Sequence, residues 1–224
     1  MTVADVVAID GPSGSGKGTI AAALAKRLGW NLLDSGALYR VVAWAALRQK
    51  IQFEDGKALG VMARGLEIEF APDGTVCVDG HAVTDAIRVD AVSAAASTVA
   101  AHPEVRVALM HVQHGMRRAP GLVADGRDMG TIVFPDARLK IFLDATVEER
   151  ARRRYKQLKD KGLSVSLRDL FASIRERDER DRTRVVSPLQ PASDAVLIDS
   201  TTMSIEEVLA EIVGLIRDRG WGSD

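Results

Sequence analysis

Short apolar runs recur along the chain and predict the buried strands of a parallel sheet. Most are rich in Val, Ile and Leu, as in strands covered on both faces. Between them lie longer segments with apolar residues three or four positions apart, which is typical of amphipathic helices. Strands that alternate with helices favour an α/β fold of parallel βαβ units. The predicted strands are Val6–Ile9, Trp30–Leu33, Leu122–Asp125, Leu139–Leu143 and Ala195–Asp199.

The predicted helices carry start and stop signals. Apolar residues recur every four positions from Ile20 to Leu28, and Gly29 then ends this helix. Ser35 is expected to N-cap the next helix, which continues through Leu47. Further helices are predicted between residues 90 and 116, parted near His102–Pro103, and after the capping residues Thr146, Ser166 and Ser204.

The middle of the chain breaks this alternation of strand and helix. Leu66–Phe70 alternates apolar and polar residues, Pro72–Gly74 has strong turn chemistry, and Val76–Val78 can return antiparallel. A small hairpin in a parallel α/β chain indicates an insertion. The end of the chain, residues 220–224, is expected to fray, which leaves Trp221 without a role.

Composition and charge narrow the class of protein. The 224 residues include 30 Lys and Arg against 31 Asp and Glu, so a basic surface for nucleic acid or anionic membrane is not expected. The single cysteine, Cys77, excludes an internal disulfide. Met1–Asp5 lacks signal-peptide character, and the apolar run Val41–Leu47 is too short to span a bilayer. We therefore expect a cytoplasmic protein.

A glycine-rich segment after the first strand carries the strongest chemical signal. It has the form Gly-x4-Gly-Lys and opens a helix, as a P-loop requires, so its backbone N–H groups and the lysine can surround nucleotide phosphates. It departs from the usual motif because Gly18 follows the lysine and the hydroxyl comes one residue later. The residues expected to hold ATP are Gly11, Pro12, Ser13, Gly14, Ser15, Gly16, Lys17, Gly18 and Thr19.

Three clusters of arginine and acidic residues indicate what the acceptor is. A phosphate acceptor is already nucleophilic at pH 7 and needs arginines rather than a general base. Asp34–Arg40 and Asp125–Asp128 follow strands, at the edge where open α/β sheets bind ligands. Arg175–Arg184 would be helical, with Arg177, Asp181 and Arg184 on one face. A solvated, ion-paired helix is the alternative for this third cluster. One or two of Arg150, Arg152, Arg153 and Arg154 can close over ATP, the others facing solvent.

At this point the chain resembles the bacterial type of cytidylate kinase, within the P-loop nucleoside monophosphate kinases. The resemblance covers nearly the whole length, and Gly18–Thr19 is normal for that family. It rests on Asp10–Thr19, Leu33–Arg40, Asp125–Thr131 and Glu176–Arg182, which are highly specific together.

The resemblance implies a three-layer P-loop kinase fold: a five-stranded parallel sheet flanked by helices, a small β-containing insertion and a helical lid. It implies one kinase domain over residues 1–224, with the core at about 1–60 and 101–224. The CMP-binding insertion would span about 61–100 and the lid about 148–166. It also implies a monomer.

Residue roles follow from the same resemblance. Arg40, Arg127 and Arg184 would hold the acceptor phosphate, with Ser35 and Tyr39 beside them. Arg177 and Asp181 would contact the ribose, and Ser97, Arg106 and Asp128 would read the base. The residues expected to act on the migrating group are Lys17, Arg127, Arg153 and Arg184.

The predicted activity is transfer of the γ-phosphoryl group of ATP to CMP and dCMP, giving ADP and CDP or dCDP. Asp128 can accept from the cytosine amine and Arg106 can donate to the ring acceptors, which favours CMP over UMP. Two alternatives remain: a shikimate-kinase-like enzyme with a hydroxyl acceptor, and a nucleotide-dependent switch.

No protein metal site is predicted. His81, His102, His111 and His114 lack metal-ligand spacing with the cysteine. Mg²⁺ is expected to be held largely by ATP phosphates and water, and Asp34 or Asp125 can hold such a water or serve as a cap or turn residue.

Overall fold

The computed structural model describes residues 3–71, 74–160 and 162–221. The chain forms two compact units, one made of residues 1–33 with 117–224 and the other of residues 34–116. The division into core, insertion and lid at the predicted boundaries stays a prediction.

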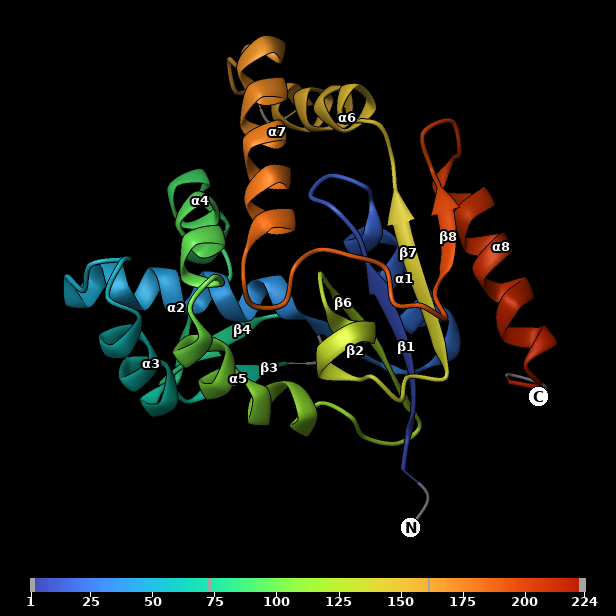
Figure 1. The fold of residues 1–224 in the computed structure, drawn as a ribbon, viewed down its shortest axis with the longest axis horizontal. Coiled ribbons are helices and arrows are strands. Elements are labelled where there is room, and N and C mark those ends of the chain that lie inside the picture. Colours follow the sequence, from blue (N-terminus) through green and yellow to red (C-terminus); the bar gives the residue numbers. More distant parts are fainter. Residues whose placement is uncertain (1–2, 72–73, 161, 222–224) are drawn as a thin grey trace. The chain divides into compact units, whose positions relative to one another are not determined.

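The first unit is built on a five-stranded parallel sheet, as predicted (Figure 1). The strand order is β2-β6-β1-β7-β8, and β1 pairs with β6 on one side and β7 on the other. Val6, Val7, Ala8 and Ile9 are all fully buried, which confirms a strand covered on both faces. The strands are β1 (Asp5–Asp10), β2 (Asn31–Asp34), β6 (Gly121–Gly126), β7 (Leu139–Asp144) and β8 (Val196–Asp199).

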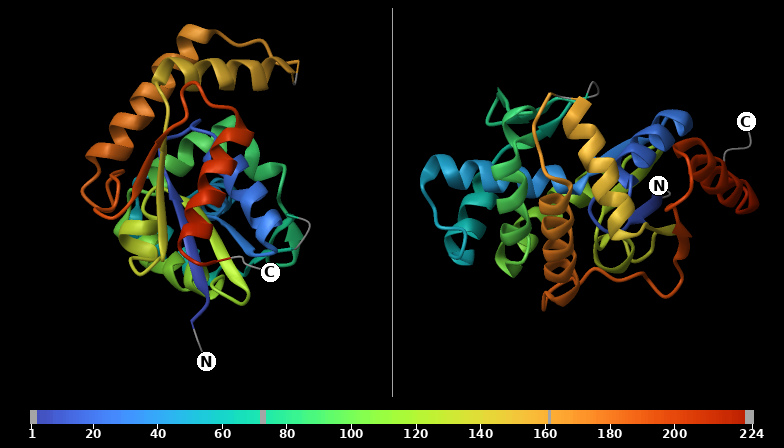
Figure 2. Two further views of the ribbon diagram at one scale, coloured as in Figure 1. Left: turned by 90° about the vertical axis from the view of Figure 1, so that its right-hand side faces the viewer. Right: turned by 90° about the horizontal axis from the view of Figure 1, so that it is seen from above.

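Two helices of the first unit cover one face of this sheet and form the main core. Ile20 and Leu24 of α1 pack with Ile212 and Ile216 of α8 against inward-facing residues of β1, β6, β7 and β8. Figure 2 shows α8 lying along the sheet and α6 crossing above it. The helices of this unit are α1 (Lys17–Leu28), α6 (Val147–Asp160), α7 (Leu167–Thr183) and α8 (Ile205–Asp218), with a π-helical turn at Met129–Val133.

The capping predictions are confirmed at four helix ends and wrong at one. At the start of α6, Thr146 Oγ1 accepts from the Glu149 N–H at 3.3 Å. Gly29 ends α1 in the left-handed conformation with φ 65°. Ser166 caps α7, and Ser204 forms a reciprocal capping box with Glu207 at α8. Ser35 does not cap α2: Asp34 is the N-cap, and its Oδ1 accepts from the Ala37 N–H at 3.0 Å. The carboxylate one residue earlier reaches the free N–H groups, so Ser35 lies inside the first turn.

The second unit combines helices with a small antiparallel sheet, which confirms the predicted hairpin. β3 pairs with β4, and a third strand β5 that was not predicted pairs with β4. The predicted turn residues Pro72 and Asp73 lie outside the described residues. Helix α3 was also not predicted. The elements are α2 (Ser35–Gln49), α3 (Gly56–Gly65), β3 (Ile68–Phe70), β4 (Val76–Val78), β5 (His81–Ala82), a 3₁₀ turn Ala86–Arg88, α4 (Asp90–Val99) and α5 (Pro103–Gly115).

Trp221 corrects the prediction of a frayed tail. Its side chain is buried in the main core, and its ring centroid lies 5.9 Å from that of Trp30. The guanidinium carbon of Arg138 lies 4.7 Å from the same ring. Trp30 in turn packs on Gly121, where an added Cβ would come within 2.3 Å of the indole. The chain is therefore ordered through Trp221, and residues 222–224 lie outside the described part.

Within the described ranges, no helix has the length and apolar character needed to cross a membrane.

Candidate active site

The P-loop leaves β1 in a conformation that requires glycine. A Cβ built on Gly11 would lie 2.1 Å from the Leu143 carbonyl oxygen, so any side chain here would collide with β7. Gly14 and Gly16 have φ values of 81° and 91°, which L-residues with side chains rarely adopt. These glycines allow the backbone to form a tight loop directly before α1.

Side chains of Lys17, of α6 and of Ser200 bond to the carbonyl oxygens of the loop. Because C=O and N–H point in opposite directions across a trans peptide, fixing a carbonyl outward turns the next N–H inward. Arg150 holds Ser13 O, and Arg153 and Ser200 hold Ser15 O, so we infer that the N–H groups of residues 14 and 16 face into the loop, as donors suited to phosphate. The contacts are Lys17 Nζ to Pro12 O at 3.1 Å, Arg150 Nη1 to Ser13 O at 2.9 Å, Arg153 Nη1 to Ser15 O at 3.3 Å and Ser200 Oγ to Ser15 O at 3.2 Å.

Asp125 explains why a glycine follows the P-loop lysine. Its Oδ1 lies 4.0 Å from Lys17 Nζ, and its Oδ2 would lie 3.1 Å from a Cβ built on Gly18. A Ser or Thr at position 18 would crowd this carboxylate. Thr19, the nearest hydroxyl in sequence, is exposed. The carboxylate beside the lysine thus comes from the end of β6.

Asp10, the residue before the P-loop, joins β1 to the turn after β6. Its two carboxylate oxygens accept from the N–H groups of Met129 and Gly130, each at 2.8 Å. Burial raises the pKa of Asp10 to about 7, the two N–H donors oppose the rise, and the charges of Asp128 and Asp125 add to it. The sequence alone gives Asp10 no role beyond its motif, because no local pattern marks Met129 and Gly130 as its partners.

A charged cluster lies between the segment after β6 and the end of α7. Asp181 is buried, and its Oδ2 accepts from Arg127 Nε at 3.1 Å. Burial alone would raise the pKa of Asp181, but the charges of Arg127, Arg177 and Arg184 lower it below its usual value. The shared face predicted for Arg177, Asp181 and Arg184 thus corresponds to an electrostatic cluster, although Arg184 is the C-cap of α7 rather than part of it.

Arg150 is the most buried of the four arginines on α6, with 1% of its surface exposed. It forms a two-point ion pair with Asp178 of α7, one contact being 3.0 Å from Nη1 to Oδ1. Its Nε also donates to Ala145 O at 2.9 Å. The sequence did not distinguish Arg150 from Arg152 and Arg154, because only its tertiary contacts set it apart.

The second unit contains the remaining residues expected to bind the acceptor. Arg40 bends back toward the start of α2, where its Nη2 donates to Asp34 Oδ2 at 2.7 Å. Arg106 is buried, donates from Nη1 to Ala100 O at 3.1 Å, and lies 5.4 Å from the Tyr39 ring centroid. Ser35 and Ser97 are also buried. A buried arginine over a tyrosine ring is a defined polar site within this unit.

The expected site residues therefore fall into two groups, and the structure brings residues together within each group. Asp34 caps α2 and pairs with Arg40, whereas Asp125 lies beside Lys17. The first unit holds Gly11–Thr19, Arg127, Asp128, Arg153, Arg177, Asp181 and Arg184; the second holds Ser35, Tyr39, Arg40, Ser97 and Arg106.

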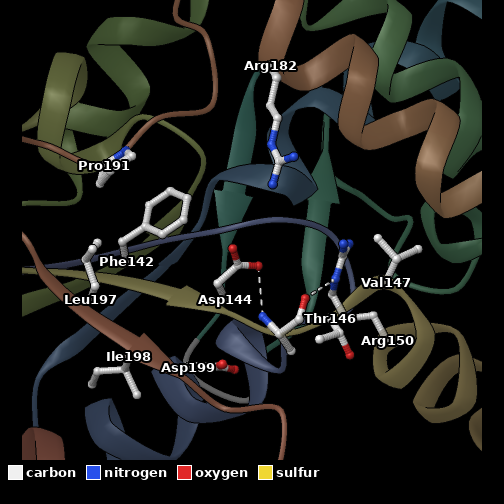
Figure 3. A pocket seen from close by; sticks show the side chains of 11 residues that line it. Phe142, Asp144, Thr146, Val147, Arg150, Arg182, Pro191, Leu197, Ile198 and Asp199 are labelled. Atoms are coloured by element: carbon white, nitrogen blue, oxygen red, sulfur yellow. Dashed lines mark hydrogen bonds between the residues drawn. The ribbon is translucent and has the colours of Figure 1, made fainter.

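A separate cavity of about 420 Å³ lies in the first unit where β7 and β8 end and α6 begins. Figure 3 shows Arg182 reaching over it from α7, above Asp144. Phe142, Pro191 and Leu197 supply an apolar side. Among its lining residues, Arg150 alone also bonds to the P-loop.

The chemistry of the P-loop region fits a magnesium nucleotide. The inward N–H groups and Lys17 suit phosphate oxygens, and a carboxylate such as Asp125 is the oxygen ligand that Mg²⁺ prefers, directly or through water. Among the described residues, no group of three or more His, Cys, Asp or Glu side chains is placed to hold a metal by itself.

A parallel sheet, a P-loop at its carboxyl edge and arginines at the next strand end define a P-loop phosphotransferase. The cytidylate kinase family profile matches residues 7–218. The chain is 58% identical over 221 residues to a cytidylate kinase of Pseudomonas aeruginosa, covering 96% of each protein. It is 54% identical over 214 residues to a cytidylate kinase of Aeromonas hydrophila, covering 94% of this chain and 93% of that one. The chain belongs to the cytidylate kinase family.

A comparison with solved structures supports the fold alone. An uncharacterized protein of Eubacterium ventriosum matches with a TM-score of 0.51 at 11% identity, over 95% of this chain and 98% of that one.

Proposed function

We propose that this protein transfers the γ-phosphoryl group of Mg·ATP to CMP and dCMP, forming ADP and CDP or dCDP. Membership of the cytidylate kinase family carries the proposal. The Asp181–arginine cluster in the unit that carries the P-loop supports a phosphate acceptor, because these arginines can offset the repulsion between two polyanions. A hydroxyl acceptor would need a general base in that place.

The P-loop and Lys17 hold the phosphates of ATP in this proposal. The backbone N–H groups of the loop donate to the phosphate oxygens, and side-chain bonds to Ser13 O and Ser15 O support the loop from α6. Lys17 exchanges its bond to Pro12 O for phosphate oxygens. Asp125 would hold Mg²⁺ through water, and the ion would supply positive charge that offsets the charge of the ATP phosphates.

Three arginines are assigned to the acceptor phosphate. Arg40, Arg127 and Arg184 bind its oxygens, and Ser35 and Tyr39 lie beside Arg40 on α2. An oxygen of this phosphate attacks the γ-phosphorus while the bond to the β,γ-bridging oxygen breaks, so ADP leaves as the diphosphate forms. Arg153 of α6 spreads the charge of the migrating group after lid closure.

Recognition of the nucleoside is assigned to two further sets of residues. Arg177 and Asp181 contact the ribose. Ser97, Arg106 and Asp128 read cytosine, and all three are buried, which suits selective hydrogen bonding. Asp128 accepts from the amine that distinguishes cytosine from uracil.

We assign the motions of catalysis to two parts of a single kinase domain. The core spans about residues 1–60 and 101–224, the CMP-binding insertion about 61–100, and the lid about 148–166. Closure of the insertion and lid excludes water and so prevents hydrolysis of ATP. We propose that the enzyme works as a monomer in the cytoplasm.

The specificity of the acceptor site provides the test. ADP release from Mg·ATP is measured with CMP, dCMP, UMP, AMP, GMP and shikimate offered separately. Strong turnover with CMP and dCMP, weak turnover with UMP and none with the others supports the proposal. Turnover with shikimate but no monophosphate overturns it, as does GTP hydrolysis that needs no acceptor.

A further inference from the structure

Arg150 connects three parts of the first unit through one guanidinium group. It donates to the P-loop at Ser13 O, to the segment before α6 at Ala145 O, and to α7 at Asp178. Arginine supplies five N–H donors in a rigid fork, so one side chain can hold these positions together. It is only 1% exposed, and its charge is balanced by a partner that is 4% exposed.

The bond to Ser13 fixes one donor of the phosphate site. With Ser13 O held by Arg150, the N–H of Gly14 points into the loop. A Cβ built on Gly14 would lie 3.2 Å from the Cβ of Arg150, so the loop and α6 pack closely here. A shift of the P-loop around bound phosphate therefore moves the group to which Arg150 is bonded.

The bond to Asp178 reaches the helix that carries the acceptor residues. Asp178 and Asp181 are three positions apart on α7, so their carboxylates lie on neighbouring faces of one helix turn. Both are buried: the first pairs with Arg150, and the second with Arg127. Helix α7 is thus anchored to the ATP-binding side and to the acceptor-binding side within a single turn.

We propose that Arg150 and Asp178 form a positioning pair that couples occupancy of the P-loop by ATP to the placement of Arg177 and Asp181. Neither residue touches the reacting atoms. The inference rests on the proposed function, because it assigns the acceptor to α7. ATP binding sets the Ser13–Gly14 peptide, Arg150 transmits its position to Asp178, and α7 presents its acceptor residues accordingly.

The test compares CMP affinity with and without the non-hydrolysable analogue β,γ-imido-ATP with Mg²⁺, by calorimetry. In the wild type the analogue tightens CMP binding by about fivefold or more, a common size of coupling between sites. Asp178→Asn keeps the shape but loses the ion pair. We expect this variant to reduce the coupling toward onefold. The affinity for CMP alone and for the analogue alone should stay within about threefold of wild type, and kcat should fall more than either KM.

Two more variants separate positioning from general damage to the fold. Arg150→Lys retains the charge but cannot reach Ser13, Ala145 and Asp178 together, so it also weakens binding of the analogue alone. Asp136→Asn is the matched control, since Asp136 forms a 2.7 Å ion pair with Arg117 before β7, at the opposite end of that strand from the P-loop. It leaves coupling and kcat unchanged.

Hydrogen exchange on the wild type tests the pair even where a variant fails to fold. Addition of the ATP analogue alone should slow amide exchange around residues 177–181 of α7. Absence of this effect, absence of coupling in the wild type, or full coupling in Asp178→Asn would each overturn the inference. Failure of CMP turnover would instead reject the proposed function, while α7 protection by the analogue would still support the link to the P-loop.

Discussion

Arg127 Nε donates to Asp181 Oδ2 at 3.1 Å, so the residue after β6 is tied to the last turn of α7. The carboxylate is buried and keeps a lowered pKa because, against its burial, the charges of Arg127, Arg177 and Arg184 favour the ionised form. It therefore remains an acceptor at neutral pH and holds Arg127 in one orientation. Two arginine-acid segments far apart in sequence form one cluster through this contact.

Asp181→Asn should impair use of the acceptor far more than use of ATP. The substitution removes a charge-assisted bond and releases Arg127. We expect the KM for CMP to rise by about 10- to 100-fold, with the KM for ATP within about threefold. Initial-rate kinetics measure both. Glu176→Gln is the control, because Glu176 pairs with Arg180 on the exposed side of α7 and should have no effect. Equal effects on both substrates would contradict the acceptor assignment.

Lys17→Met should abolish most activity without unfolding the protein. The lysine supplies charge to the phosphates, and loss of one such contact costs on the order of 100- to 1,000-fold in kcat. The substitution also removes the ammonium group that lies 4.0 Å from Asp125 Oδ1 and donates to the Pro12 carbonyl. Turnover and circular dichroism are measured together. A variant with near-normal kcat would reject the role of Lys17.

Asp128→Asn should narrow the preference for CMP over UMP. The carboxylate can accept from the cytosine amine, whereas an asparagine amide can also donate to a uracil carbonyl. We expect the ratio of kcat/KM for CMP to that for UMP to fall by about 10-fold or more. The discriminating measurement is this ratio rather than either rate. An unchanged ratio would show that another residue reads the base.

Asp10 should make stability depend on pH between about 4 and 7. Its pKa is raised from 3.8 to about 7 by burial, against the opposing Met129 and Gly130 N–H groups. The folded state then holds a proton that the unfolded state has lost. The contribution is fully present below pH 4 and is lost as pH rises to about 7, at about 1.4 kcal/mol per pH unit.

Asp10→Asn isolates this contribution, because the amide does not titrate. Urea unfolding of both proteins gives the difference in unfolding free energy, wild type minus variant. This difference should fall as pH rises from 5 to 7 and level off above it. Parallel curves would mean that Asp10 is ionised throughout and that its two N–H donors outweigh burial.

Trp221→Ala should destabilise the fold, although it lies only three residues from the end of the chain. The indole is 5% exposed and packs with Trp30 in the main core. Truncation of a buried tryptophan costs about 3–5 kcal/mol. Chemical unfolding measures it, with Val185→Ala as a control at a side chain that is 98% exposed. A change below about 0.5 kcal/mol would contradict the packing of Trp221.

Much of the first unit follows from local sequence. The apolar runs predicted all five strands of the parallel sheet, and residues such as Gly29 and Ser204 marked helix ends through their own backbone or side-chain chemistry. The prediction of Ser35 as the N-cap was wrong. Both Asp34 and Ser35 suit an N-cap, and α2 begins at Ser35, which makes Asp34 the cap. Trp221 was missed because polar and glycine neighbours obscure a residue that packs on the distant Trp30.

The candidate site was predictable where a motif is contiguous in sequence. The P-loop and the arginine segments are of this kind. Arg150 was not singled out, because its neighbours in sequence are also arginines and its burial depends on Asp178, 28 positions away. The relation of Gly18 to Asp125 likewise joins α1 to the end of β6, and no local pattern marks it.

Direct observation of the products from Mg·ATP and CMP tests the central claim. Phosphorus NMR or chromatography follows ATP, ADP, CMP and CDP in one reaction, with a parallel reaction that lacks CMP. We expect CDP and ADP to form in equal amounts and ATP to remain nearly intact without CMP. Release of inorganic phosphate with no CDP, at the same rate in both reactions, would contradict it.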